Sequence, residues 1–364
     1  MLLAAIAGLV WANSPLWLGL EAFKSMTFGF ADATYTLEGW VYNFGIPAFF
    51  FLVGLELKRE FTFGALKRPT ALLVPGFAAV CGVVLPAAAF LFVTAGAGTA
   101  GSGWPIPTAT DVTFSLAILM LFGKSLPPIA RTFLLSFAVI DDLIAIGIIT
   151  VLFLGSPNPA NLAAVIAYAT AFAFVLKLRM HGRLLWAIRA SAVILAILAL
   201  YNAVTSGMQA SVIGVVLGLL VPATQTQKVQ ETLHPWVAGL VLPLFALFAV
   251  GVNLGVMNVF TQTIFWAVMT RPLAKFAGVF IGGLLGQRIS GEFKELGLST
   301  LARVSVLAGI GFTISLLVAK LTFSLEPNLL ISAVAATLLA TLVSATAGAL
   351  ALVRAHRPKA TDRA

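Results

Sequence analysis

The chain has 364 residues, of which 60 % are hydrophobic and only 10 % are charged. A soluble domain carries about a quarter charged residues, so this composition excludes one and indicates a polytopic membrane protein. The net charge of +9 would also suit a nucleic-acid partner, but the basic residues sort by loop. Lys67, Arg68 and Arg288 fall on one predicted side and Lys24 on the other. This positive-inside pattern predicts a lipid bilayer, and no nucleic acid, as the partner.

Twelve apolar windows are long enough to predict membrane-spanning helices in an all-α protein. In chain order they lie at about 2–20, 41–63, 70–94, 107–122, 129–154, 160–178, 183–201, 206–222, 235–257, 262–287, 300–324 and 328–353. They form one predicted transmembrane domain over residues 1–364, with both termini in the cytoplasm, where the basic loops belong. The segment of about 25–38 predicts either a short outer hairpin or a plain loop.

The fourth and eleventh predicted helices are interrupted. The fourth begins with prolines and threonines up to Asp111, and the eleventh contains Gly309 and Gly311 in the run GIGFT. Prolines and glycines weaken a helix where a regular span should lie deep in lipid. The triplets at about 70–154 and 262–353 stand in corresponding positions with opposite orientation, each with its break in the central helix. We therefore predict inverted repeats whose broken helices cross, as in secondary transporters.

Three of the five aspartates lie in apolar sequence: Asp111, Asp141 and Asp142. An ionisable side chain at the centre of a membrane helix costs roughly 2.5 to 3.5 kcal/mol, and such residues usually mark an ion or proton pathway. Asp141 and Asp142 are consecutive, so on a helix they diverge by roughly 100 degrees and should have different partners. We expect one to bind a cation and the other to face a basic residue. A purely structural polar knot is the alternative.

The predicted basic partner is Arg271, in an apolar segment that also holds Lys275 one turn later. A cation at mid-span needs an anionic partner, which Asp141 or Asp142 would supply. Arg271 and Asp111 would also compensate the partial charges of the helix ends that meet at the crossing. Carboxylates are hard oxygen ligands for small cations, and one that holds Na+ cannot hold H+ at the same time. That competition is sufficient for coupled exchange.

Five segments resemble the NhaA family of bacterial sodium/proton antiporters: FFLVGLELKRE, GWPIPTATDVTFSLAIL, FAVIDDLIAI, LHPWVAGLVLPLFA and LAGIGFTISLLVA. The resemblance covers nearly the whole chain, and these motifs at these separations are far more specific than any one of them alone. It implies a homodimer in the bacterial inner membrane that exports one Na+ or Li+ for about two H+ by alternating access, without a cofactor.

The resemblance also implies residue roles. Asp142 would be the primary cation and proton site, and Asp141 its neighbour that contacts the basic residue of the tenth helix. Thr110 and Asp111 would lie at the helix crossing, and Thr110 would approach the ion. Glu56, near charged residues at a helix end, would belong to a cytoplasmic funnel, although a solvated helix end is the plainer interpretation.

This chain departs from the family at two positions. Arg271 stands where the family has lysine, and arginine is not deprotonated in proteins. Both protons would then travel on Asp141 and Asp142, or the stoichiometry would differ. Gln209 stands where some members carry a histidine linked to pH activation. We therefore expect any pH switch to come from carboxylates or from the chain's three histidines, His181, His234 and His356.

Two other functions are compatible with parts of the pattern. Asp111 and Asp141 could form the catalytic pair of an intramembrane aspartyl protease, but the residues before them, Thr110 and Ile140, do not fit its glycine-containing motif. A proton- or sodium-coupled transporter of an organic anion could use Arg271 and Lys275 to hold its substrate. Nearby carboxylates would repel that anion. We therefore predict an antiporter and no enzyme.

Overall fold

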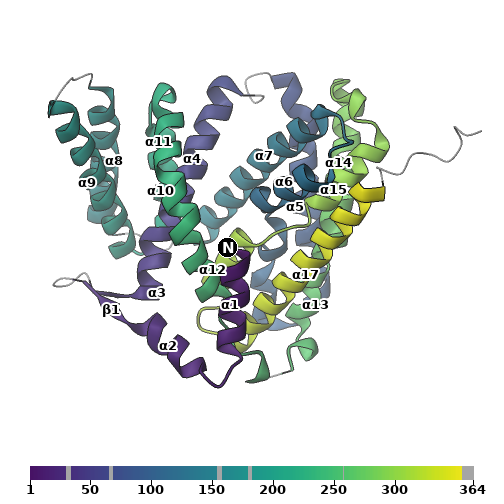
Figure 1. Cartoon of the computed structure of the whole chain (residues 1–364), viewed down its shortest axis with the longest axis horizontal. Coiled ribbons are helices and arrows are strands. Elements are labelled where there is room, and N and C mark those ends of the chain that lie inside the picture. Colours follow the sequence, from purple (N-terminus) through teal and green to yellow (C-terminus); the bar gives the residue numbers. More distant parts are fainter. Residues whose placement is uncertain (30–33, 65–68, 154–157, 179–182, 257, 355–364) are drawn as a thin grey trace, which may run out of the picture. The chain divides into compact units, whose positions relative to one another are not determined.

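The computed structural model describes residues 1–29, 34–64, 69–153, 158–178, 183–256 and 258–354. The chain forms two compact units, and Figure 1 labels their helices and strands. Unit 1 comprises Met1–Lys67 and Ile149–Asn253, and unit 2 comprises Arg68–Ile148 and Leu254–Ala364. Both units are built almost entirely from helices, as the composition predicts.

Unit 1 contains two short strands and the helices of its two chain segments. Its elements are α1 (Leu2–Ala12), α2 (Trp17–Ser25), β1 (Thr27–Phe28), β2 (Tyr35–Thr36), α3 (Leu37–Trp40), η1 (Val41–Gly45), α4 (Ile46–Phe63), α8 (Pro159–Lys177), α9 (Arg183–Thr205), α10 (Ala210–Leu220), α11 (Ala223–Trp236), η5 (Val237–Val241) and α12 (Leu242–Val250). The strands pair antiparallel, Thr27 with Thr36. This pairing favours the hairpin over the plain loop, with residues 30–33 outside the described part.

The first predicted helix, 2–20, is wrong as a single straight element. The structure divides it into α1 and α2, which are bent by 117° at the intervening break. Pro15 lies in that break, and proline disfavours helical backbone at the residue before it. The Asn13 side chain donates to the Leu9 carbonyl at 2.8 Å, which satisfies an acceptor at the end of α1.

Glycines allow the main helices of unit 1 to approach closely. A Cβ added at Gly54 of α4 would collide with the Val215 carbonyl of α10, and one added at Gly214 or Gly218 of α10 would collide with backbone of α4. Small residues at a helix interface permit such contact in a membrane, where there is no hydrophobic driving force between helices.

Unit 2 contains the remaining elements. These are α5 (Pro69–Val93), η3 (Gly98–Gly103), η4 (Ile106–Thr108), α6 (Val112–Phe122), α7 (Pro128–Leu152, whose last residues belong to unit 1), η6 (Leu254–Val256), η7 (Val259–Thr261), α13 (Thr263–Met269), α14 (Arg271–Ser290), η8 (Lys294–Leu296), α15 (Leu298–Leu307), α16 (Thr313–Thr322) and α17 (Pro327–Val353). Glycines again form the closest interface: Gly278, Gly282 and Gly286 recur every fourth residue on α14 and lie against the backbone of α5.

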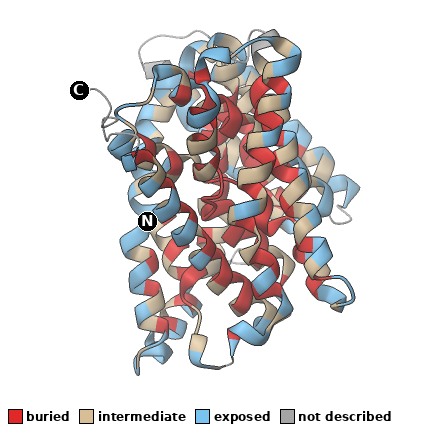
Figure 2. Cartoon of the chain, turned by 90° about the vertical axis from the view of Figure 1, so that its right-hand side faces the viewer, coloured by how far each residue is buried: buried red, intermediate tan, exposed pale blue. Residues whose placement is uncertain are grey.

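Many helices are long and apolar enough to cross a membrane. Among the described residues there are 8, or up to 10 if each bent pair counts as one span, and three further apolar helices, α10, α15 and α16, are shorter. Individual helices carry buried residues on one side and exposed residues on another, as Figure 2 shows. The number of twelve spans is not confirmed by these lengths and stays a prediction.

Candidate functional site

Two non-helical stretches of unit 2 contact each other, 109–111 before α6 and 308–312 between α15 and α16. The backbone N–H of Asp111 donates to the Ile310 carbonyl at 2.6 Å, and the Thr110 hydroxyl donates to the Ala308 carbonyl at 2.9 Å. A Cβ added at Gly311 would lie 2.5 Å from the Ala109 carbonyl oxygen. Only glycine therefore allows this backbone approach, and the carbonyls freed at one break are satisfied from the other.

Asp111 lies at the start of two helices. Its Oδ1 accepts from the backbone N–H of Phe114 at 3.4 Å, which makes it the N-cap of α6. Its Oδ2 accepts from the hydroxyl of Thr313 at 2.9 Å and from the Thr313 backbone N–H at 3.3 Å, at the first residue of α16. A carboxylate is stabilising at a helix N-terminus, where the partial charge is positive. This one carboxylate serves two such ends.

Asp141 and Lys275 form a buried ion pair. The Lys275 Nζ lies 2.6 Å from Asp141 Oδ1, and both side chains are 0 % exposed. Lys275 also donates to the Thr108 carbonyl at the end of η4. The other carboxylate oxygen, Oδ2, accepts from the Thr110 backbone N–H at 3.1 Å. Asp141 on α7 therefore contacts both α14 and the break before α6.

Arg271 is predicted to pair with Asp141 or Asp142, and for Asp141 this prediction is wrong, because the cation at Asp141 is Lys275. Arg271 is fully buried, but its guanidinium donates to the Gly311 carbonyl at 2.8 Å, to the Thr337 carbonyl at 3.1 Å and to the Thr341 hydroxyl at 2.7 Å. Within the described part of the chain it forms no ion pair. Arg271 starts α14 and reaches toward α16 and α17, whereas Lys275, one turn later, reaches Asp141.

Asp142 follows Asp141 on α7 and is half-buried. Consecutive helical residues diverge by about 100 degrees, so its carboxylate leaves α7 in another direction from that of Asp141. Gly309 lies against α17 and the start of α14, because a Cβ there would approach the Ser344 hydroxyl to 2.6 Å and the Pro272 Cα to 3.4 Å. Unit 2 thus brings together Thr110, Asp111, Asp141 and Arg271 with the glycines of the second break.

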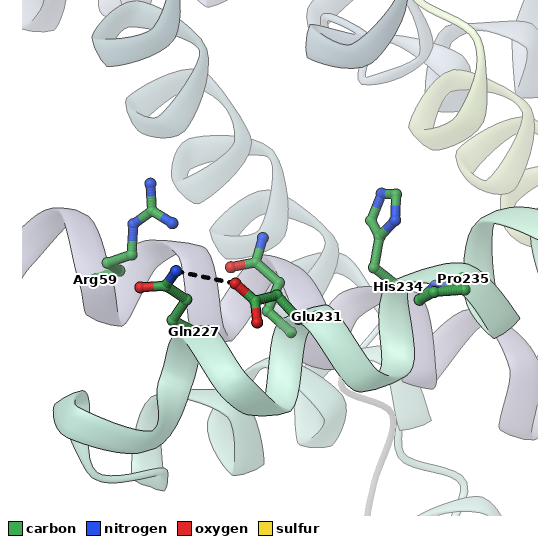
Figure 3. Close-up of a pocket in the computed structure, with 6 residues that line it drawn as sticks. Arg59, Gln227, Glu231, His234 and Pro235 are labelled. Atoms are coloured by element: carbon green, nitrogen blue, oxygen red, sulfur yellow. Dashed lines mark hydrogen bonds between the residues drawn. The ribbon is translucent and has the colours of Figure 1, made fainter.

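Glu56 lies in unit 1, half-buried on α4. One turn later the same helix carries Arg59, which lines a cavity of about 380 Å³ together with Gln227, Gln230, Glu231, His234 and Pro235 of α11 (Figure 3). Gln227 donates to Glu231 across one turn at 2.9 Å. His234 is therefore beside other charged and polar groups, whereas His181 and His356 lie outside the described residues.

Gln209 is the N-cap of α10 and donates to the Ser211 hydroxyl at 3.3 Å.

Sequence reasoning missed three contributors to this site. The sequence suggests Lys275 only as part of a substrate clamp, and it assigns no role to Thr313 or Thr341. Thr313 follows the two glycines at the start of a helix, which is a usable signal for a polar contact at a break. Thr341 is one of several hydroxyl residues on α17, and little in the sequence distinguishes it from Thr346, which bonds only within its own helix.

Comparison with known proteins covers nearly the whole chain. Residues 1–352 match the family described as Na+/H+ antiporter 1. The chain is 38 % identical to the Na(+)/H(+) antiporter NhaA 2 of Clavibacter michiganensis, over 99 % of this chain and 90 % of that protein. It is 36 % identical to the Na(+)/H(+) antiporter NhaA of Thermobifida fusca, with 98 % and 91 % covered. The NhaA 3 antiporter of Streptomyces coelicolor is also 36 % identical, with 95 % and 75 % covered.

Proposed function

This chain belongs to the Na+/H+ antiporter family NhaA, whose members are transporters rather than enzymes, and from this premise we propose that it exports Na+ or Li+ in exchange for H+, with the ions competing for the buried carboxylates of unit 2. The observation that carries the proposal is the Asp141–Lys275 pair, a charged contact without access to water in a mostly apolar chain. Such groups inside a membrane are costly and mark ion pathways.

Exchange at Asp141 would work by replacement of one positive charge by another. The carboxylate is neutralised by Lys275 in the structure. A cation or a proton that binds Asp141 makes that neutralisation unnecessary, so the ion pair opens when the ion enters. Because a carboxylate cannot hold Na+ and H+ at the same oxygen together, loading by one ion expels the other, and the two fluxes are coupled.

Asp142 would be the primary cation site, as the resemblance implies. Thr110 would supply a further oxygen ligand: its backbone N–H donates to Asp141, and its hydroxyl, which donates to the Ala308 carbonyl, keeps lone pairs that a small hard cation could use. Carboxylate and hydroxyl oxygens together fit Na+ and Li+, and no cofactor is needed.

Asp111 and Arg271 would act as fixed charges that compensate the helix ends at the two breaks. Asp111 accepts from the starts of α6 and α16, and Arg271 donates to carbonyl oxygens around the second break. Neither charge would change during exchange. Two protons per cation would then travel on Asp141 and Asp142, which makes the exchange electrogenic.

We propose twelve spans, with the short helix α10 as one and α15 and α16 together as another, which would place both termini in the cytoplasm. The triplets around α6 and around α15–α16 would be the inverted repeats, and their relative movement would give alternating access. Glu56 would attract cations to a cytoplasmic funnel. We further propose the bacterial inner membrane as the location, a role in pH homeostasis, and a homodimer paired through the hairpin β1–β2.

An organic-anion transporter would need Arg271 and Lys275 to hold its substrate. Both cations instead donate to oxygen atoms of the chain itself, Arg271 to carbonyls and hydroxyls and Lys275 to Asp141. The contacts therefore favour the antiporter.

The test is Na+-driven proton movement in proteoliposomes that hold an imposed pH gradient. Addition of Na+ or Li+ should release protons from wild-type vesicles, seen as dequenching of a pH-sensitive dye, whereas choline should not. The Asp142→Asn variant should show no dequenching when Na+ or Li+ is added. Its unfolding temperature should equal that of wild type. Wild-type vesicles that respond to a small organic anion but to neither cation would overturn the proposal.

A further inference from the structure

Lys275 has a third neighbour besides Asp141 and the Thr108 carbonyl. Its Nζ lies over the ring of Phe137, 5.7 Å from the ring centroid. Phe137 and Asp141 are four residues apart on α7, so both side chains lie on the same face of the helix and meet the same ammonium group. The negative face of an aromatic ring attracts a cation at this distance, most strongly where water is excluded.

The ring is held in place by neighbours on its own helix and on α5. Phe137 is 0 % exposed, and its ring stacks on that of Phe133, with centroids 6.3 Å apart and an interplanar angle of 17°. The ring also lies near Gly82 of α5. A Cβ added at Gly82 would lie 3.6 Å from Phe137 Cε2, 3.7 Å from Lys275 Cε and 2.9 Å from Val279 Cγ2. The ring and the lysine stem therefore share the space that this glycine leaves open.

This arrangement matters when Asp141 binds an ion. The ammonium then loses its nearest counter-charge while it remains buried, and a buried charge without a close counter-ion is costly. Two of its three contacts do not depend on the charge of Asp141: the Thr108 carbonyl and the Phe137 ring. They stabilise the ammonium in the state in which Asp141 is occupied, and so they lower the cost of ion binding.

We infer that Phe137 is a positioning residue for exchange, whose ring retains the Lys275 ammonium when a cation takes its place at Asp141. The inference rests on the proposed function. Phe137 touches neither the transported ion nor a reacting atom, and it acts through Lys275. Removal of the ring raises the energy of the Na+-bound state relative to the Na+-free state, because Asp141 neutralises Lys275 only in the latter. Na+ should consequently bind more weakly.

The experiment compares Phe137→Leu, Phe137→Met and Phe137→Tyr with Phe133→Leu as the matched control, which alters the same aromatic stack without contacting Lys275. Apparent KM for Na+ and maximal rate are measured in proteoliposomes at one pH, and thermal unfolding is measured in detergent. We expect Phe137→Leu and Phe137→Met to raise KM by up to about tenfold, because the ring contact exists in both states and only its strengthening around the unneutralised ammonium affects Na+ binding. The maximal rate should stay close to that of wild type.

Phe137→Tyr keeps a ring face, so its KM should stay close to that of wild type, as should that of Phe133→Leu. If Phe137→Leu does not fold, Phe137→Met carries the comparison. A KM for the Leu and Met variants equal to that of the Phe133→Leu control would overturn the inference. Absence of Na+-driven proton movement in wild type would instead overturn the proposed function, so the two failures are distinguishable.

Discussion

The ammonium group of Lys275 and the carboxylate of Asp141 form a fully buried ion pair, with Nζ 2.6 Å from Oδ1. Two buried charges stabilise each other only as long as both are present, because removal of one leaves the other without compensation in a medium that solvates it poorly. A change in the charge of either group should therefore change the stability of unit 2.

This coupling predicts the effect of Lys275→Met. The variant leaves the Asp141 carboxylate buried and unpaired, which should lower the free energy of unfolding by about 3 to 5 kcal/mol. The double variant Lys275→Met with Asp141→Asn removes both charges and should recover most of that loss. Thermal unfolding in detergent measures both. Equal unfolding temperatures for the single and double variants would show that the two groups do not depend on each other.

Gly311 predicts a second effect. A Cβ at this position would lie 2.5 Å from the Ala109 carbonyl, 3.0 Å from Arg271 Nη1 and 3.0 Å from Ser315 Oγ. The carbonyl is backbone, and the other two atoms are held by hydrogen bonds of Arg271 to the Gly311 carbonyl and to the Ser315 hydroxyl. Gly311→Ala should therefore destabilise the protein by about 1 to 3 kcal/mol, the usual range for overpacking.

The matched control for Gly311 is Gly147, on the same helix as Asp141. A Cβ there meets nothing within 4 Å, and alanine is the better helix former. Gly147→Ala should leave thermal unfolding in detergent unchanged or slightly raise its temperature. If both alanine variants behave alike, the close approach of the two non-helical stretches does not limit stability.

Arg271 and Thr341 should be energetically coupled through hydrogen bonds, although the two residues form no ion pair. The guanidinium donates to the Thr341 hydroxyl at 2.7 Å, and that hydroxyl donates to the Gly311 carbonyl at 2.6 Å, which Arg271 also contacts. In a double-mutant cycle of Arg271→Met and Thr341→Val, residues that share partners should show a coupling energy of about 0.5 to 3 kcal/mol.

Thermal unfolding of the four proteins of this cycle measures the coupling energy. Thr346→Val serves as the control, because that exposed hydroxyl bonds only to carbonyls of its own helix, Leu342 and Val343. Its cycle with Arg271→Met should give additive effects. Additivity for Thr341→Val as well would mean that Arg271 does not hold α17 to the second break.

The sequence displays some local features of this region. The prolines before Asp111 and the glycines at 309 and 311 indicate weakened helices, and the structure has non-helical backbone at 109–111 and 308–312. That these stretches interrupt two membrane spans which cross stays a prediction. Asp111 was predicted for the helix crossing because an acidic residue suits helix N-termini. These predictions depend on local backbone preferences, which a sequence displays directly.

The partner of Asp141 could not be chosen from the sequence. Arg271 and Lys275 are four residues apart, so they lie on one face of α14 and differ only by about one turn, roughly 5.4 Å along the axis. Which of them reaches Asp141 depends on how α14 is placed against α5 and α7, and the glycine contacts that bring α14 against α5 are formed only in the folded protein. The sequence does not distinguish Phe137, because a phenylalanine in an apolar helix is most often part of the core.

Lys275→Arg tests where the two protons travel. Arginine keeps its charge throughout and cannot release a proton. If both protons are carried by Asp141 and Asp142 while the cation of α14 stays charged, the variant should still exchange two protons per Na+, although the larger guanidinium should lower its rate.

Electrogenic exchange responds to membrane voltage, so Na+-driven proton movement should change when a potassium diffusion potential is imposed with valinomycin. Asp141→Asn provides the comparison, because it removes one proton carrier and should abolish this voltage response if any exchange remains. A folded Lys275→Arg protein whose exchange is insensitive to voltage, beside a voltage-sensitive wild type, would instead assign the second proton to the Lys275 ammonium.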